Sequence, residues 1–183
     1  MEIALITNTG QCFSDNPDYR QRITSLLAFG IFDHIVLIGN DTDGTSLPDG
    51  IEHCSLWRRK TRRIVDADFL KMLRKLGKKR KTDKRIWIFG ADAEGDVLRL
   101  ALELSDCSLS SVVLANYCLS QSGEEYLGAA LKCMEKIPGV KVISEDVASR
   151  FFLFESTDHR QDTRGARPAT DEPKHKPKQN DEV

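Results

Sequence analysis

The sequence lacks most of the features that would assign a protein to a class at first sight. No apolar run reaches the ~18 residues that a membrane-spanning helix needs, so we predict no membrane span. The five cysteines include no CxxC pair, and none of the four histidines has metal-ligand spacing to another histidine or cysteine, which argues against a zinc site. Neither GxxxxGK[ST] nor GxGxxG occurs, so no phosphate-binding loop is predicted.

We also expect no secretory leader, because the first residues, MEIALIT, already have the pattern of a strand. The cysteines are odd in number and most of them lie in or beside apolar runs. Unpaired thiols of this kind are typical of a reducing compartment. We therefore expect an intracellular protein of the cytoplasm or, in a eukaryote, of the mitochondrion or nucleus.

Charge is present in both signs, but it is unevenly distributed. The net charge is −1, yet residues 58–85 hold fourteen Lys or Arg against three Asp, an excess of eleven positive charges. One interpretation is a solvated basic surface, and another is binding to an anionic partner, foremost RNA. Nuclear targeting by RRKTRR or KKRK is a third. The residues predicted to bind are Arg58, Arg59, Arg62, Arg63, Lys78, Lys79, Arg80 and Lys81.

Short apolar runs alternate with segments of helical period along the first 144 residues. The runs predict strands at 2–7, 34–38, 53–57, 86–89, 111–115 and 140–144. Helices are predicted at 18–32, 66–77, 94–104 and 123–137, and loops at 8–17 and 41–50. Alternation of this kind predicts an α/β fold, a three-layer Rossmann-like parallel sheet of about six strands with helices on both faces.

The character of the chain changes after residue 155. Residues 156–183 contain no Ile, Leu, Met, Phe, Trp or Tyr and hold three prolines. A segment of this composition buries too little apolar surface to offset its ordering entropy, so we expect a tail that is disordered on its own. The predicted organisation is an α/β domain at 1–155 followed by this polar tail.

In such a sheet the ligand crevice lies beyond the carboxyl ends of the strands. The residues that follow those ends are Asn8, the 58–63 cluster, the acids from Asp92 to Asp96, and Asn116. Asp92 and Asn116 are the predicted pocket residues.

Four motifs near these ends carry a family resemblance. Residues 8–13 read NTGQCF, residues 90–97 read GADAEGDV, residues 116–120 read NYCLS, and residues 139–145 read GVKVISE. In this order they resemble the isochorismatase-like (cysteine hydrolase) family, over residues 1–154 and with most specificity at 90–147. In that family the nucleophilic Cys lies just before the Val, where this chain has Asp96. The general base is an Asp at the end of the first strand, where this chain has Asn8.

The resemblance implies that the catalytic positions are degenerate. The family's catalytic Lys follows the third strand, where Arg59 and Lys60 are the nearest matches, and we assign the position to Lys60. A carboxylate at Asp96 is a poor nucleophile toward amides, and Asn8 cannot accept a proton near neutral pH. Cys118 offers little rescue, because it matches a position that packs under the sheet.

We therefore expect a binding or scaffolding subunit. Its partners would be RNA, or the subunits of a ribonucleoprotein or protein complex, engaged through residues 58–85 and the tail. The resemblance also implies a homo-oligomer. An active hydrolase with an altered site is the first alternative.

The acids Asp92, Glu94 and Asp96 leave a second alternative open. Carboxylates at this turn satisfy the positive end of a helix, or they hold a hard cation such as Mg²⁺. The latter resembles PIN/NYN-like ribonucleases, although Asn8 stands where those enzymes need an acid. No cofactor or metal ligand set is predicted unless Asp92 and Asp96 converge on Mg²⁺.

Overall fold

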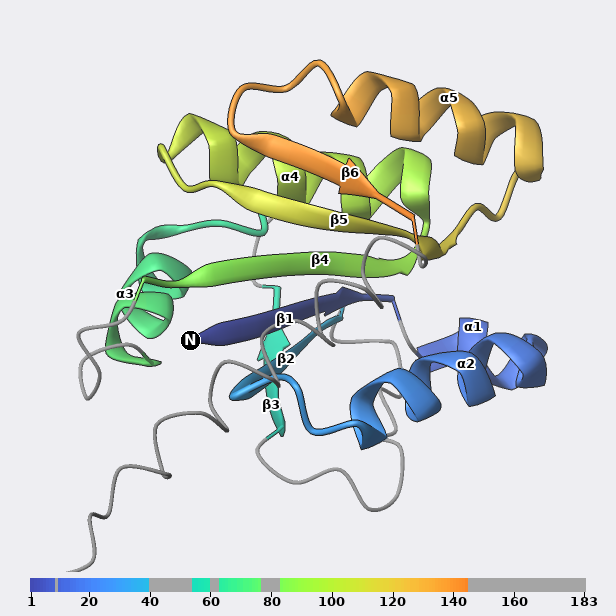
Figure 1. Ribbon diagram of the computed structural model, residues 1–183, viewed down its shortest axis with the longest axis horizontal. Helices are drawn as coiled ribbons and strands as arrows, with labels where there is room; N and C mark the ends of the chain where they lie inside the picture. The colour runs from blue at the N-terminus through green and yellow to red at the C-terminus, as the bar shows by residue number, and fades with distance from the viewer. Residues whose placement is uncertain (9, 40–53, 60–62, 77–82, 145–183) are drawn as a thin grey trace, which may run out of the picture.

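The computed structural model describes residues 1–8, 10–39, 54–59, 63–76 and 83–144. Six strands form one sheet in the order β3-β2-β1-β4-β5-β6, and each neighbouring pair is parallel (Figure 1). The strands are β1 (Glu2–Thr7), β2 (His34–Gly39), β3 (Cys54–Arg58), β4 (Arg85–Ala91), β5 (Ser111–Leu119) and β6 (Val140–Ile143). The order reverses between β1 and β4, and this is the place where such sheets open a crevice.

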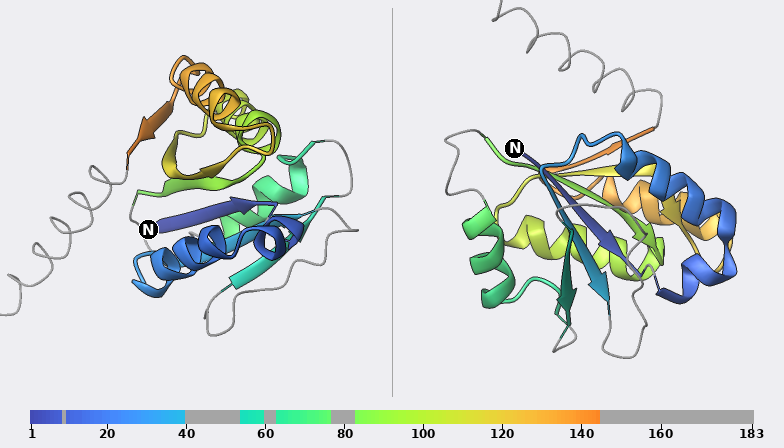
Figure 2. Two further views of the ribbon diagram at one scale, coloured as in Figure 1. Left: turned by 90° about the vertical axis from the view of Figure 1, so that its right-hand side faces the viewer. Right: turned by 90° about the horizontal axis from the view of Figure 1, so that it is seen from below.

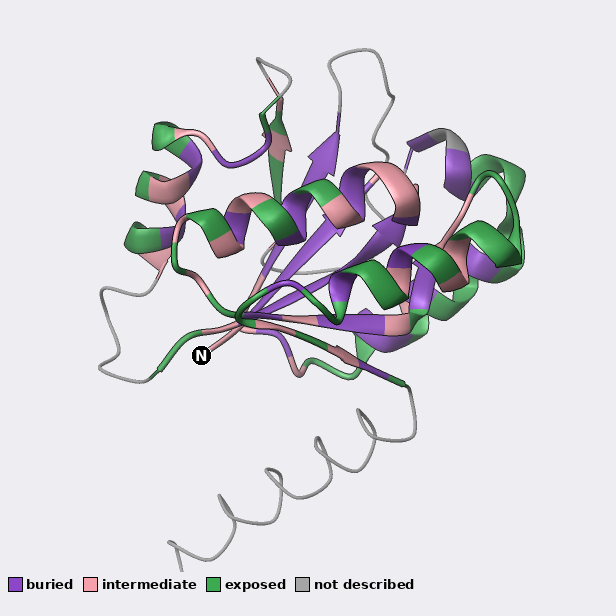
Figure 3. Ribbon diagram, turned by 90° about the horizontal axis from the view of Figure 1, so that it is seen from above, coloured by how far each residue is buried: buried purple, intermediate pink, exposed green. Residues whose placement is uncertain are grey.

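Helices cover both faces of the sheet. Helices α1 (Gly10–Asp15) and α2 (Pro17–Ala28) lie on one face, as the two views of Figure 2 show. The opposite face carries α3 (Ala67–Leu76), the π-helix η1 (Ala93–Val97), α4 (Leu98–Asp106) and α5 (Glu124–Met134) (Figure 3). Right-handed crossovers place the helices in this way, because the chain leaves β1 in one direction and β4 in the other. The predicted three-layer α/β architecture is confirmed.

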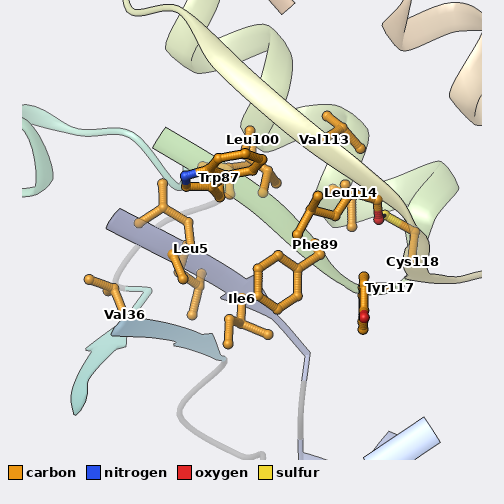
Figure 4. Packing of buried hydrophobic residues seen from close by; sticks show 14 of the residues in the cluster. Leu5, Ile6, Val36, Trp87, Phe89, Leu100, Val113, Leu114, Tyr117 and Cys118 are labelled. Atoms are coloured by element: carbon orange, nitrogen blue, oxygen red, sulfur yellow. Dashed lines mark hydrogen bonds between the residues drawn. The ribbon is translucent and has the colours of Figure 1, made fainter. Parts of the chain in front are cut away.

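The core lies in the two central strands, which are buried on both faces. Ile3 and Ile86 are paired across β1 and β4 and point to the α3 and α4 side. Trp87 and Phe89 point to the other face, where the centroids of their rings lie 6.4 and 6.0 Å from that of Phe32. The ring centroids of Phe89 and Tyr117 are 6.1 Å apart (Figure 4). Burial of each such side chain contributes about 1.5–3 kcal/mol, so these unbroken apolar runs stabilise the centre of the sheet.

The first loop departs from the prediction. Residues 8–17 were expected to be irregular, but α1 forms within them and buries Cys12 and Phe13. The next helix begins at Pro17, which suits the first helical position because it lacks an N–H. That helix stops at Ala28 rather than near residue 32, since Gly30 takes a left-handed conformation with φ +65°.

The fifth strand is also longer than predicted. It continues to Leu119 instead of ending at residue 115, and its register with β4 shifts between Ile88 and Gly90. Ile88 pairs with Val113 and Gly90 with Cys118, so β5 carries extra residues at an irregularity. Asn116 lies in that irregular stretch and is exposed, which makes the expectation that it follows the strand wrong.

Other predictions fall outside the described residues. They include His53, the loop at 41–50 and the tail at 156–183, so the division into 1–155 and 156–183 stays a prediction. Within the part of the chain that the structure describes, every helix is too short or too polar to cross a bilayer.

Candidate functional site

The site is built where β1, β3 and β4 end at the same edge of the sheet. Asn8 follows β1 and its N–H donates to the Ile38 carbonyl at 3.1 Å. Arg59 follows β3 and its N–H donates to the Gly39 carbonyl at 3.1 Å. Each bond extends the ladder by one residue, so the backbone holds both side chains firmly at the crevice.

The turn after β4 has an unusual backbone. Asp92 is left-handed, with φ 62° and ψ 59°, and its Oδ2 accepts the Asp96 N–H at 3.3 Å. A Cβ on Gly95 would lie 2.7 Å from Asp92 Cγ, so a side chain at this position would displace the Asp92 carboxylate. The chain then winds as the π-helix η1 before α4 begins. Single π-turns and left-handed non-glycine residues are concentrated at functional sites.

The Asp96 carboxylate lies inside this turn and is fully engaged. Its Oδ1 lies 2.6 Å from Arg59 Nη1, and its Oδ2 accepts the Asn8 side-chain N–H at 2.6 Å. The Asp96 and Arg59 side chains are 8% and 7% exposed. We call Asn8, Arg59 and Asp96 the Asp96 cluster. Arg99 stands at its margin, 3.8 Å from Oδ1 and 46% exposed.

Two of the three predicted catalytic positions, Asn8 and Asp96, contact each other in the structure. Asn8 and Asp96 were predicted, and of the two cations considered after β3 it is Arg59 that contacts Asp96. Lys60 lies outside the described residues. The sequence does not choose between Arg59 and Lys60, because a shift of one residue after β3 changes which side chain enters the crevice.

The pKa values of the two neighbouring acids, Asp92 and Glu94, are shifted in opposite directions. Burial, and next the Asp96 charge, raise the pKa of Asp92. Burial also acts to raise the pKa of Glu94, but hydrogen bonds from its own backbone and from Ser120 and Ser122 outweigh it and lower that pKa. Ser120 Oγ donates to Glu94 Oε1 at 2.8 Å. This link between η1 and the end of β5 was not predicted, since nothing in the spacing of residues 94 and 120 indicates it.

A magnesium site would need the carboxylates of Asp92 and Asp96 to converge. Asp92 instead bonds to a backbone N–H, and Asp96 faces a guanidinium and an amide. Among the described residues, no three His, Cys, Asp or Glu side chains are grouped so that they could hold a metal ion.

The thiols near this edge are poor nucleophiles. Burial raises the pKa of Cys12 and raises that of Cys118 to about 12. The Cys118 Sγ lies in the core and donates to the Leu114 carbonyl at 3.3 Å. A thiol attacks as the thiolate, so neither group is a ready nucleophile.

The predicted basic residues divide into three sets. Arg58 and Arg63 are exposed, whereas Arg59 is buried and directed at Asp96. Arg59 is thus held inside the crevice rather than on the surface. The remaining predicted contacts lie outside the described residues: Arg62, Lys78, Lys79, Arg80 and Lys81.

A scan against protein-family models and a search of curated proteins find no match. Solved structures do match. The MAR1 ribonuclease of Caenorhabditis elegans is 15% identical with a TM-score of 0.62, over 93% of this chain and 96% of that one. A nicotinamidase of Staphylococcus aureus is 17% identical with a TM-score of 0.60, over 77% and 96%. An isochorismatase-like hydrolase of Alkaliphilus metalliredigens is 14% identical with a TM-score of 0.63, over 82% and 98%.

These likenesses are too distant in sequence to transfer an activity, and they establish the fold. It is that of the isochorismatase-like hydrolases, as the four motifs implied. Sequence and structure thus agree on the scaffold.

Proposed function

We propose that this chain, with its isochorismatase-like fold, has lost the hydrolase chemistry and serves as a binding or scaffolding subunit for RNA or a ribonucleoprotein complex. The observation that carries the proposal is the Asp96 cluster. A carboxylate occupies the nucleophile position, and both of its oxygens are bonded within 2.6 Å to Arg59 and Asn8. A carboxylate with both oxygens bonded in this way is neither a free nucleophile nor a free base.

Binding of an anionic partner rests on a different observation. Residues 58–85 carry an excess of eleven positive charges. The exposed part of that segment includes Arg58 at the end of β3 and Arg63 before α3. Cations so placed near one edge of the sheet neutralise phosphates and release counterions on binding, which gives affinity but little sequence preference.

The proposal is tested by fluorescence anisotropy with a single-stranded RNA across a salt series. We expect the affinity to fall steeply with salt, and replacement of both Arg58 and Arg63 by Ala to reduce the log–log slope by ~1.4, since each single-strand phosphate contact contributes ~0.7. The control replaces Lys132 and Lys136, exposed on and just after α5, and should leave the slope unchanged. Affinity indifferent to salt and to the Arg58 and Arg63 changes would refute RNA binding by this segment.

A ribonuclease that uses Asp92 is the second candidate. One structural neighbour is named as a ribonuclease, and the raised pKa of Asp92 is of the kind seen at active sites. In the same experiment, cleavage of the RNA that is lost in Asp92→Asn would favour this candidate over the scaffold.

A further inference from the structure

A second site lies at the opposite edge of the sheet from the Asp96 cluster. A cavity of about 260 Å³ opens between α3 and the turn that joins α4 to β5. Its floor is formed by Ile3 and Ile86, which are paired at the amino-terminal ends of β1 and β4. Leu73 and Leu70 of α3 and Leu109 of the turn complete an aliphatic wall. We call this space the α3 cavity.

The backbone explains why the space stays open. Of the ten residues of α3, only Phe69 and Leu73 are buried, so the helix touches the sheet along a narrow line. On the other side the chain leaves α4 through Ser108, which is left-handed with φ 57°. The N–H of Leu109 donates to the Leu104 carbonyl at 2.9 Å, as in a Schellman cap. A capped turn is rigid, which keeps this wall of the cavity from collapsing onto α3.

The charged side chains that line the cavity are positive. Among the described residues that line the cavity, Arg74 and Lys84 are cations and none is a carboxylate. Lys84 Nζ donates to the carbonyls of Leu73 at 3.0 Å and Arg74 at 3.5 Å, which fixes the ammonium beside the end of α3. An ammonium has three donors, so one remains for a ligand. Ser108 and Ser110 add hydroxyl groups to the lining.

These features together select one class of ligand. A phosphate of RNA needs no aliphatic wall, and a wholly apolar molecule needs no cations. We propose that the α3 cavity binds a small amphipathic carboxylate, whose chain packs on the partly exposed Leu70 and Leu109 and whose head group pairs with Arg74 and Lys84. The volume suits roughly a dozen non-hydrogen atoms, since it falls just below the range of drug-sized pockets. This inference does not depend on the function proposed for the Asp96 cluster.

The test is calorimetric titration of the full chain with octanoate, set against 1-octanol. Octanoate should bind, and Arg74→Glu should weaken it about tenfold or more, because a charge-assisted hydrogen bond is lost and repulsion replaces it. Lys75→Glu is the matched control: it makes the same charge change one residue away on α3, outside the cavity lining. Lys75→Glu should alter the dissociation constant for octanoate by less than about twofold, because solvent and salt screen an exposed charge that does not contact the ligand.

A thiol supplies an independent readout. Cys107 lines the cavity and is partly exposed, whereas Cys133 is exposed on α5 away from it. Bound octanoate should slow alkylation of Cys107 severalfold, measured by peptide mass spectrometry, and leave the Cys133 rate unchanged. Absence of octanoate binding, equal binding of 1-octanol, equal loss in Lys75→Glu, or unaltered labelling of Cys107 with octanoate bound would each overturn the proposal.

Discussion

Replacing Asp96 by Ala should destabilise the fold by about 3–5 kcal/mol, because it leaves the Arg59 guanidinium buried without its anion. The Arg59 side chain is 7% exposed and pairs with Asp96 Oδ1 at 2.6 Å. For a chain of 183 residues this corresponds to a fall of roughly 6–20 °C in Tm. Thermal and urea unfolding of the variant beside the wild type measure the effect.

Two further variants separate this cause from others. Arg99→Ala removes a partly exposed cation 3.8 Å from the same carboxylate and should cost less than about 1 kcal/mol. The double change of Asp96→Leu with Arg59→Met removes both charges and should recover most of the loss, since apolar residues replace a buried pair well. An Asp96→Ala variant as stable as the wild type would mean that the pair contributes nothing.

Gly90→Ala should prevent the chain from folding. Gly90 ends the pairing of β1 with β4 and has φ +143°, a conformation that residues with side chains rarely adopt. An added Cβ would meet the Thr7 carbonyl oxygen and lie 2.6 Å from the Thr7 nitrogen. Thr7 cannot move aside easily, because its hydroxyl donates to the Ala91 carbonyl at 3.0 Å in the core. We expect insoluble or unfolded protein, a loss of about 4 kcal/mol or more.

The same substitution at Gly128 is the control. Gly128 lies within α5, and a Cβ there would meet no atom within 4 Å. Gly128→Ala should stabilise the protein by about 0.5–1 kcal/mol through helix propensity and the entropy of the unfolded chain. Circular dichroism and unfolding curves for both variants provide the comparison. A soluble, native-like Gly90→Ala protein would show that the close approach of Gly90 to Thr7 is not required for folding.

The fold was accessible to prediction because its signals are local. Each central strand is an unbroken apolar run, and Asp66 precedes α3 as a helix cap, with its Oδ1 accepting the Phe69 N–H at 2.8 Å. The helix α1 was not accessible, since six residues of mixed polarity have no clear period. The irregular register of β5 was missed for a related reason: it depends on how Gly90 and Cys118 pair, which no local pattern specifies.

The site was predictable in its positions and not in its contacts. Parallel strands end at one edge, so Asn8 and Asp96 had to approach each other across 88 residues of chain. The hydrogen bond between these two side chains could not be predicted, nor could the contact of Arg59 with Asp96. Both depend on the directions in which the side chains point, which a sequence pattern does not specify. Glu103 is a similar case: its carboxylate accepts the N–H groups of Ile64 and Val65 at 2.8 and 2.7 Å and so anchors the segment that follows the site.

The most direct measurement is ammonia release from nicotinamide, the amide in the name of one structural neighbour, the Staphylococcus aureus nicotinamidase. A carboxylate locked between a guanidinium and an amide should give no release above that of an Asp96→Asn control, at any pH from 5 to 9. Turnover by the wild-type protein that disappears in Asp96→Asn would contradict us and make the carboxylate a working catalytic group.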